Sequence, residues 1–442
     1  MQNWLTMTAS DLGREIEAGR ADPVDLAETY LDAARSHPLC NRIFARLMPE
    51  RALSEARAAK ARAASGRRLS ALDGVPISWK DLFDTAGVLT EAGSALLKGR
   101  VPDHDARVLT NATRAGLVCL GKTHMSELAF SGLGLNPVTE TPPCVNDPDA
   151  VAGGSSSGAA TSVAFNLASA GIGSDTGGSV RIPAAWNDLV GLKTTSDRLS
   201  LDGVVPLIPS FDTVGPLTRS VEDAAQLLAA MEAGRPADLR GASLAGRRLA
   251  VLETAALDDL GAEPAKSFEA AISRLAAAGA IIEPIRVPAV TDVLSISAIL
   301  YSGEAYGLWR DVIEANPHLM YDEILERFRA GGTFSAADFA AGWKTVKEAR
   351  SAYYAATASY DAVLLPSSPI LPPNRERLTT DHDYYVRVNL LALRNTRIGN
   401  LMGACGLTLP AGTPSCGLMM MAPPGTEEAL LRLGYAAEMA LA

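Results

Sequence analysis

The sequence predicts an α/β fold, in which strands and helices alternate around a buried sheet. Three observations lead to this prediction. Residues 70–220 alternate short apolar runs ("GVPISWK", "GLVCLGK") with helical patterns ("DARVLTNATRAG", "SGAATSVAFNLASA"). Further along, "GRRLAVLE", "EPAKSFEAAISRLAAAGA" and "IIEPIRVP" have the composition of a strand–helix–strand unit. The chain has 442 residues, 48% of them hydrophobic, which is enough to bury a large interior.

The N-terminal segment, residues 1–66, is predicted to be helical. "SDLGREIEAG" offers a Ser or Asp cap and ends on a glycine, and Pro23 then starts "PVDLAETYLDAARSH". The strong helix formers of "PERALSEARAAKARAASG" end at Gly66. Before them, "NRIFARLM" predicts a short strand.

Residues 70–235 carry the alternating pattern, and "AATSVAFNLASA" within them predicts a buried helix. Residues 236–442 supply the rest of the sheet, a helical region over about 290–360 that covers it as a cap, and a last helix, "EEALLRLGYAAEMALA". "YDAVLLPSSP", "GLTLPAG" and "CGLMMMAPPG" predict the strands of this part. We expect one integrated domain over residues 1–442.

Composition narrows the function classes. The net charge of −10 argues against nucleic acid and anionic membranes as partners. Residues 150–174 carry no charge, but they hold too many small and polar residues for a spanning helix, so we expect a buried segment. The start of the chain lacks a secretory pattern, which makes a cytoplasmic enzyme the default. Neither disulfides nor a metal site is expected, because the five cysteines lack CxxC spacing and the histidines form no HxxH pair.

One apparent motif is a coincidence of letters. "GLVCLGKT", residues 116–123, matches the phosphate-loop pattern GxxxxGK[ST]. That motif needs a strand before the glycine-rich loop, whereas here the variable positions are themselves an apolar run and the preceding segment is helical. We therefore predict a strand and no nucleotide site.

Two glycine- and serine-rich clusters, "GGSSSG" and "GSDTGGS", stand out in residues 152–181. By composition alone they fit a linker, a phosphate cradle or the rim of an active site. Consecutive small residues let backbone amides converge on an oxyanion, and Ser179 would lie beside them as a nucleophile. No histidine is near it in sequence. Lys80, at the end of an apolar run, is the alternative base, because burial favours its neutral amine.

Together, "GVPISWKDLFDTAG", "GGSSSGAA" and "GSDTGGSVRIPAA" resemble the amidase signature family of serine hydrolases, in the same order along the chain. "GLVCLGKTHMSELAFSG", "DLVGLKTTSDRLSLDGV" and "FDTVGPLTRSVEDAA" extend the resemblance over about residues 70–235. It implies a large, mixed, twisted β-sheet covered by helices on both faces. It also implies an acyl-enzyme mechanism without a cofactor or metal.

The resemblance implies a role for each matching residue. Ser179 would be the nucleophile, Ser155 would relay the proton from a cis peptide, and Lys80 would be the neutral base. The residues expected to form the oxyanion hole are Thr176, Gly177, Gly178 and Ser179. Those expected to orient the triad are Ser156, Ser174, Asp175 and Arg181. Those expected to contact substrate, in "ELAFSGLGLNP", are Phe130, Ser131, Gly132 and Leu133.

Several neighbouring residues receive plainer interpretations. Arg181 is expected to brace its loop, with contact to a substrate carboxylate as the alternative. Asp81 and Asp84 are expected to be turn and cap residues, and His124 to be structural. The aromatic residues expected in the core rather than in the pocket are Tyr301, Tyr306 and Trp309.

The leading functional hypothesis is an amidase that hydrolyses a small-molecule carboxamide or a urea- or carbamate-like C–N bond. The first alternative is the glutaminase subunit of a tRNA-dependent amidotransferase. That subunit follows its GLKPT with a "YGRVSRYG"-like segment, whereas this chain has "TTSDRLSLDG". The second alternative is a partner-dependent or non-catalytic subunit of the same fold. A homo-oligomer and a small accessory subunit remain open.

Overall fold

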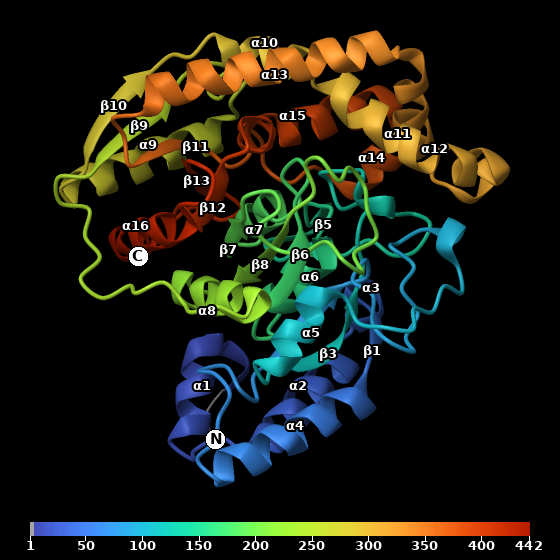
Figure 1. Cartoon of the computed structure of the whole chain (residues 1–442), viewed down its shortest axis with the longest axis vertical. Helices are drawn as coiled ribbons and strands as arrows, with labels where there is room; N and C mark the ends of the chain where they lie inside the picture. Colours follow the sequence, from blue (N-terminus) through green and yellow to red (C-terminus); the bar gives the residue numbers. More distant parts are fainter. Residues whose placement is uncertain (1–3) are drawn as a thin grey trace.

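An eleven-stranded sheet forms the centre of the computed structural model, which describes residues 4–442 (Figure 1). The strand order is β1-β3-β2-β6-β8-β7-β12-β13-β11-β9-β10, and β4 and β5 form a separate pair. The strands are β1 (Phe44–Leu47), β2 (Pro76–Lys80), β3 (Val118–Thr123), β4 (Pro143–Cys144), β5 (Asp147–Val151), β6 (Gly171–Ser174), β7 (Val190–Lys193), β8 (Val214–Thr218), β9 (Arg248–Leu252), β10 (Ile281–Ile285), β11 (Ala362–Pro366), β12 (Cys405–Pro410) and β13 (Gly417–Ala422).

The sheet is mixed, as expected. β3, β2 and β6 are parallel neighbours near one end, and β11, β9 and β10 are parallel at the other. The strands between β6 and β11 pair antiparallel. The predicted strand–helix–strand unit is confirmed, because α9 connects the parallel strands β9 and β10.

Helices flank the sheet. Figure 1 shows α1, α2 and α4 at one end of the long axis and α10, α11, α12 and α13 at the other. The helices are α1 (Ala9–Glu17), α2 (Pro23–Ser36), α3 (Cys40–Ile43), α4 (Pro49–Ala64), α5 (Arg107–Arg114), α6 (Ser157–Ala164), α7 (Arg181–Trp186), α8 (Val221–Glu232), α9 (Ala262–Ala277), α10 (Ala289–Ser295), α11 (Ser297–Ala315), α12 (Asp322–Arg329), α13 (Ala336–Thr357), α14 (Arg375–Thr380), α15 (His382–Met402) and α16 (Glu427–Leu441).

Every residue of β2, β3, β6 and β8 is buried. Covered strands need no polar face, which explains why their sequences are apolar runs without alternation. The phosphate-loop match lies in β3, so the predicted strand is confirmed there.

Three local predictions need correction. "NRIFARLM" starts as the short helix α3 and becomes strand β1 only at Phe44, where it pairs with β3. Helix α1 is capped by the side chain of Thr8, which accepts from the Asp11 amide, and not by Ser10 or Asp11.

The helix predicted over "AATSVAFNLASA" ends early, at Ala164. Asn166 adopts a left-handed conformation with φ 61°, and the amides of Leu167 and Ala168 both donate to the carbonyl of Ser162. The turn leads into β6, so the uncharged stretch is a helix, a turn and a strand. Within residues 4–442, every helix is too short or too polar to cross a membrane.

Helix α15 was not predicted. Its buried side includes polar residues, which dilute the apolar periodicity by which a helix is identified in a sequence. Three of these buried residues are Asn389, Asn395 and Asn400.

Candidate active site

Lys80 is the last residue of β2, and its side chain is completely buried. Its Nζ donates hydrogen bonds to Ser155 Oγ at 2.7 Å and to Ser174 Oγ at 2.8 Å. Ser174 ends β6, the parallel neighbour of β2. Because parallel strands end at the same edge of a sheet, the topology brings the lysine and this serine together.

Burial lowers the pKa of Lys80 to about 7, because an ammonium ion loses its hydration there. The negative charges of Asp212 and Asp175 oppose this shift. Both hydrogen-bond partners of Lys80 are neutral hydroxyls. The amine is therefore able to lose and regain a proton near neutral pH.

Ser155 lies in the loop between β5 and α6, and the Gly154–Ser155 peptide bond is cis, as the family resemblance implies. The backbone of residues 130–134 holds this loop, because the amide of Gly154 donates to the carbonyl of Gly132 at 2.8 Å. The Ser126 amide donates to the Ser155 carbonyl at 3.1 Å. Backbone hydrogen bonds thus fix the position of Ser155, and its hydroxyl contacts Lys80 Nζ.

Ser179 lies in the loop between β6 and α7, only 3% exposed. Among residues 4–442, no group accepts from or donates to its hydroxyl. The Ser156 amide donates to the Ser179 carbonyl at 3.2 Å and so joins the two serine loops. Ser156 also ties to β6, where its hydroxyl donates to the carbonyl of Ser174 at 3.2 Å.

The loop that contains Ser179 folds around the carboxylate of Asp175. The amides of Gly178 and Val180 donate to it at 2.9 and 3.1 Å. Gly178 has φ 140°, and a Cβ atom there would lie 2.1 Å from the hydroxyl of Thr396. Only glycine fits this position, because other residues rarely adopt this φ and because a side chain would collide with Thr396.

The expected oxyanion hole narrows from four amides to three, because the Gly178 amide is already used by Asp175. Tyr301 donates its hydroxyl to the carbonyl of Thr176 at 3.0 Å, and Thr396 donates to the carbonyl of Gly177 at 2.7 Å. In a trans peptide the carbonyl of one residue and the N–H of the next point in opposite directions, so these two bonds orient the amides of Gly177 and Gly178. Within residues 4–442, the amides of Thr176, Gly177 and Ser179 have no acceptor.

Arg181 is completely buried against Asp175, with its Nη2 at 2.8 Å and its Nε at 3.0 Å from the carboxylate oxygens. It also donates to Asn400 Oδ1 at 2.6 Å and to the carbonyl of Thr396 at 2.8 Å. The positive charge of Arg181 holds the pKa of Asp175 well below its usual range. The guanidinium therefore braces the loop, and contact with a substrate carboxylate is excluded by its partners.

The predicted substrate-contacting stretch divides in two. Phe130 and Ser131 line a small cavity together with Ser179. Gly132 and Leu133 do not line it, and their carbonyls instead accept from the loop of Ser155.

The aromatic residues of α11 also divide. Tyr301 lines the cavity at Ser179, which corrects its expected place in the core alone. Trp309 is buried away from that cavity, as expected, and Tyr306 is only half-buried.

Asp81 lies in a turn, as expected, and Asp81 and Asp84 are in addition buried ion-pair residues. Asp81 contacts Arg46 at 2.7 Å and Lys122 at 3.3 Å, and Asp84 contacts Arg100 at 2.6 Å. None of the five lines the cavity at Ser179.

His124 does not contact the catalytic candidates, and burial lowers its pKa to about 4. The five cysteines are all free thiols. Across residues 4–442, no group of three His, Cys, Asp or Glu side chains is placed to hold a metal ion.

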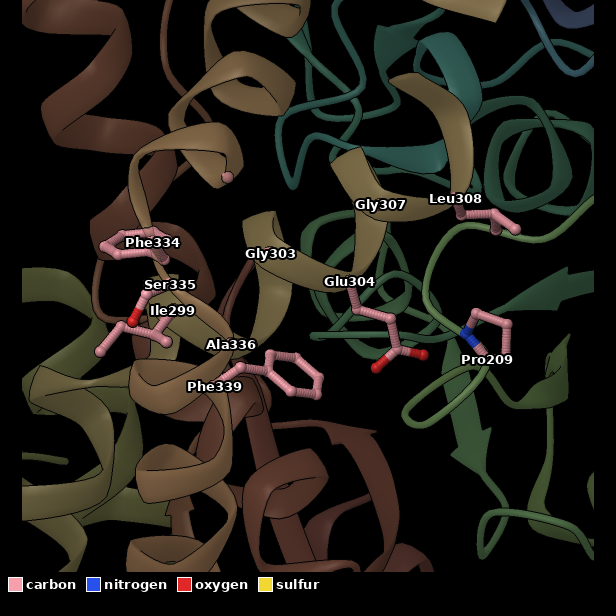
Figure 2. Close-up of a pocket in the computed structure, with 11 residues that line it drawn as sticks. Pro209, Ile299, Gly303, Glu304, Gly307, Leu308, Phe334, Ser335, Ala336 and Phe339 are labelled. Atoms are coloured by element: carbon pink, nitrogen blue, oxygen red, sulfur yellow. The ribbon is translucent and has the colours of Figure 1, made fainter. Parts of the chain in front are cut away.

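A second cavity, of about 590 Å³, lies on another face of α11 (Figure 2). Its lining is mostly apolar, and the carboxylate of Glu304 accepts from the Ser210 amide at 2.9 Å. It shares no lining residue with the cavity at Ser179. Although this cavity is large, it does not contain Ser179, so we do not assign the reaction to it.

The sequence did not indicate the contacts that hold the Ser179 loop from other parts of the chain. Asp212 accepts from the hydroxyl of Thr176 at 2.5 Å, and Asn400 donates to Asp175 at 2.9 Å. The only signal for Asp212 was its place in "FDTVGPLT", a segment that carried part of the family resemblance. Tyr301 was expected only in the core, and Thr396 and Asn400 had no signal. The contacts of all three residues depend on how α11 and α15 dock.

The fold and this site define a hydrolase that acts on amide C–N bonds. The family model Amidase matches residues 25–431, and the chain belongs to that family.

Individual relatives agree with this assignment. The chain is 32% identical to the 2-amino-5-chloromuconic acid deaminase of Comamonas testosteroni, over 98% of this chain and 96% of the relative. It is 30% identical to one component of the glutamyl-tRNA(Gln) amidotransferase of Cereibacter sphaeroides (strain ATCC 17023), over 98% of this chain and 97% of that component. A solved amidase structure superposes with a TM-score of 0.87 at 30% identity, over 99% of this chain and 100% of that chain.

Proposed function

We propose that the protein hydrolyses a small-molecule carboxamide, or a urea- or carbamate-like C–N bond, through an acyl-enzyme on Ser179. The observation that carries the proposal is the 2.7 Å contact between Lys80 and Ser155, made by a buried lysine whose pKa is about 7. A neutral amine in this position can accept the Ser155 proton while it donates to Ser174.

In the first half-reaction, Ser179 Oγ attacks the carbonyl carbon of the amide. Its proton passes to Ser155, whose own proton passes to Lys80. The amides of Thr176, Gly177 and Ser179 supply the donors for the oxygen of the tetrahedral intermediate. The ammonium of Lys80 then returns its proton through Ser155 to the departing nitrogen, and ammonia or an amine leaves.

In the second half-reaction, water attacks the acyl carbon. The same Ser155 and Lys80 pair takes the proton of the water, and the collapse of the intermediate breaks the bond to Ser179 Oγ. That oxygen regains its proton through Ser155, and the carboxylic acid product leaves. Lys80 ends as a neutral amine, ready for another cycle. We place this chemistry in the cytoplasm, which the five free thiols favour.

The second candidate is a glutaminase-type subunit that works with partners. The near full-length similarity to the amidotransferase component favours it. Against it stands "TTSDRLSLDG" after β7, which departs from the segment typical of glutaminase subunits. Hydrolysis of small amides by the purified chain alone distinguishes the two, because a partner-dependent or non-catalytic subunit would show none.

The test of the nucleophile uses a fluorophosphonate probe, which labels activated serines. We expect labelling of the wild type, no labelling of Ser179→Ala, and wild-type labelling of the control Ser157→Ala. Ser157 is buried in α6 and its hydroxyl has no hydrogen-bond partner, so it is a matched serine without a proposed role. Undiminished labelling of Ser179→Ala would overturn the assignment. A screen of aliphatic, aromatic, dicarboxylic and urea-type amides for ammonia or amine release tests the turnover.

A further inference from the structure

Two arginines near the candidate site have no acidic partner. Arg327 lies on α12 and Arg397 on α15. Arg397 is 9% exposed and Arg327 is partly buried. Among residues 4–442, no carboxylate lies within 4.0 Å of either guanidinium, which sets them apart from Arg181 and its partner Asp175.

The hydrogen bonds of the two arginines are few and neutral. Arg327 Nη1 donates to the carbonyl of Phe130 at 2.8 Å. Arg397 Nη1 donates to Ser297 Oγ at 3.2 Å, and its Nε is buried without an acceptor. Each guanidinium also lies over an aromatic ring, Arg327 at 4.3 Å from the centroid of Phe130 and Arg397 at 5.5 Å from that of Tyr301. Ring faces compensate a cation only in part.

Both arginines line the small cavity that contains Ser179. Both also line an adjoining cavity of about 180 Å³, so they form the wall that the two cavities share. Two acidic residues, Glu323 and Glu326, line this adjoining cavity, and Glu323 contacts His382 at 2.9 Å rather than an arginine. Burial and the positive charge of Arg397 together lower the pKa of Arg327 to about 10.

A buried cation without a counter-charge is costly, and two that repel each other are more so. Such a pair is retained where an anion completes it on binding. The planar guanidinium matches a carboxylate with paired hydrogen bonds. Since the cavity also holds the nucleophile, the anion that reaches this wall has to be part of the reacting molecule.

We propose that Arg327 and Arg397 bind a carboxylate of the substrate, and that the preferred substrates are short amides bearing a carboxylate, such as the monoamides of short dicarboxylic acids. The inference rests on the proposed amide hydrolysis at Ser179. Arg327 and Arg397 are then specificity-determining residues: they select the charged substrate and place its amide at Ser179.

The first experiment compares each monoamide with its neutral diamide: malonamate with malonamide, succinamate with succinamide, and glutaramate with glutaramide. We expect kcat/KM of the wild type to favour the charged member at the chain length that reacts best. Arg327→Met and Arg397→Met should each lower kcat/KM for that charged amide about 10- to 100-fold, the loss typical of a charged hydrogen bond, with the diamide little changed. Equal losses on both substrates, or a wild type that favours the diamide, would overturn the proposal.

Arg350→Met is the matched control. Arg350 on α13 is also partly buried and has no carboxylate partner, but it donates to the carbonyl of Leu401 at 2.7 Å, near the C-terminus of α15, and lines neither cavity. A helix C-terminus favours a cation, so this arginine already has a structural role. Arg350→Met should lower Tm and keep the charged-to-neutral ratio. Arg327→Met and Arg397→Met should keep Tm at or above that of the wild type while they lose the ratio.

A binding measurement separates this inference from the proposed function. Titration of the wild type with malonate, succinate and glutarate by calorimetry needs no turnover. Binding that weakens in Arg327→Met and Arg397→Met and persists in Arg350→Met supports the carboxylate site even in a preparation that hydrolyses nothing. A wild type that is labelled at Ser179 and hydrolyses neutral amides, but binds none of these dicarboxylates, retains the proposed function and refutes the carboxylate site.

Discussion

Lys80 and Lys122 lie on neighbouring parallel strands, and both side chains are completely buried. Trp79 pairs with Lys122 across β2 and β3, so Lys80, one position later, points to the opposite face of the sheet. Their surroundings differ in one decisive respect. Lys80 meets two hydroxyls, whereas Lys122 meets the carboxylate of Asp81 at 3.3 Å and the hydroxyl of Thr90 at 2.9 Å.

The difference bears on the proposed role of Lys80 as a base. Burial lowers the pKa of both lysines, but for Lys122 the adjacent negative charge of Asp81 opposes the shift at close range. For Lys80 the opposing carboxylates, Asp212 and Asp175, are not hydrogen-bonded to it. Hydroxyl partners leave the amine free to exchange a proton, whereas a carboxylate partner stabilises the protonated ammonium. The same residue type is therefore suited to the proposed proton transfer on one face of the sheet and to a structural ion pair on the other.

The largest expected effect is on activity. Lys80→Met removes the proposed base, and we expect kcat/KM to fall by about 10³-fold or more, as in other triads that lose a member. Lys122→Met, its matched control, should stay within about tenfold of the wild type. Ammonia release from the best amide of the screen measures both. Similar losses in the two variants would mean that Lys80 acts through the fold rather than as a base.

The second prediction concerns stability, and here Lys122→Met should have the larger effect of the two variants. Lys122→Met leaves Asp81 buried with Arg46 as its remaining charged partner, and we expect the free energy of unfolding to fall by about 1–3 kcal/mol. Lys80→Met removes an amine with neutral partners and should stay within about 1 kcal/mol of the wild type. Urea unfolding followed by circular dichroism measures both. A Lys80→Met protein that is the less stable of the two would contradict the comparison.

The smallest effect is the pH dependence of the wild type. A pKa of about 7 for Lys80 means that its neutral fraction falls as the pH drops below 7. We expect kcat/KM to be level above about pH 8 and to fall tenfold per pH unit well below 7. Lys122→Met should keep the same midpoint, because Lys122 faces away from the site. A flat profile between pH 5 and 8 would rule out titration of Lys80.

How much of the site the sequence predicted depends on how local each feature is. Lys80, Ser155 and Ser179 could be identified because each lies in a short segment with its own pattern. The Gly178 amide was expected in the oxyanion hole, but it donates to Asp175 instead. The sequence could not indicate this bond, because it depends on the fold of the loop. The ion pairs of Asp81 and Asp84 could not be predicted, because their partners Arg46 and Arg100 are separated from them along the chain.

By itself, the sequence determined the α/β class, the buried strands and the three residues proposed for the chemistry, because hydrophobic runs and short glycine-rich motifs encode local geometry. Only the tertiary structure decided what surrounds them. Arg181 meets Asn400 across 219 positions, and Tyr301 meets Thr176 across 125. The tertiary structure also brings Arg327 and Arg397 to one cavity from two helices. Contacts of this range depend on how helices dock against the sheet, and docking depends on the summed packing of surfaces that no single segment contains.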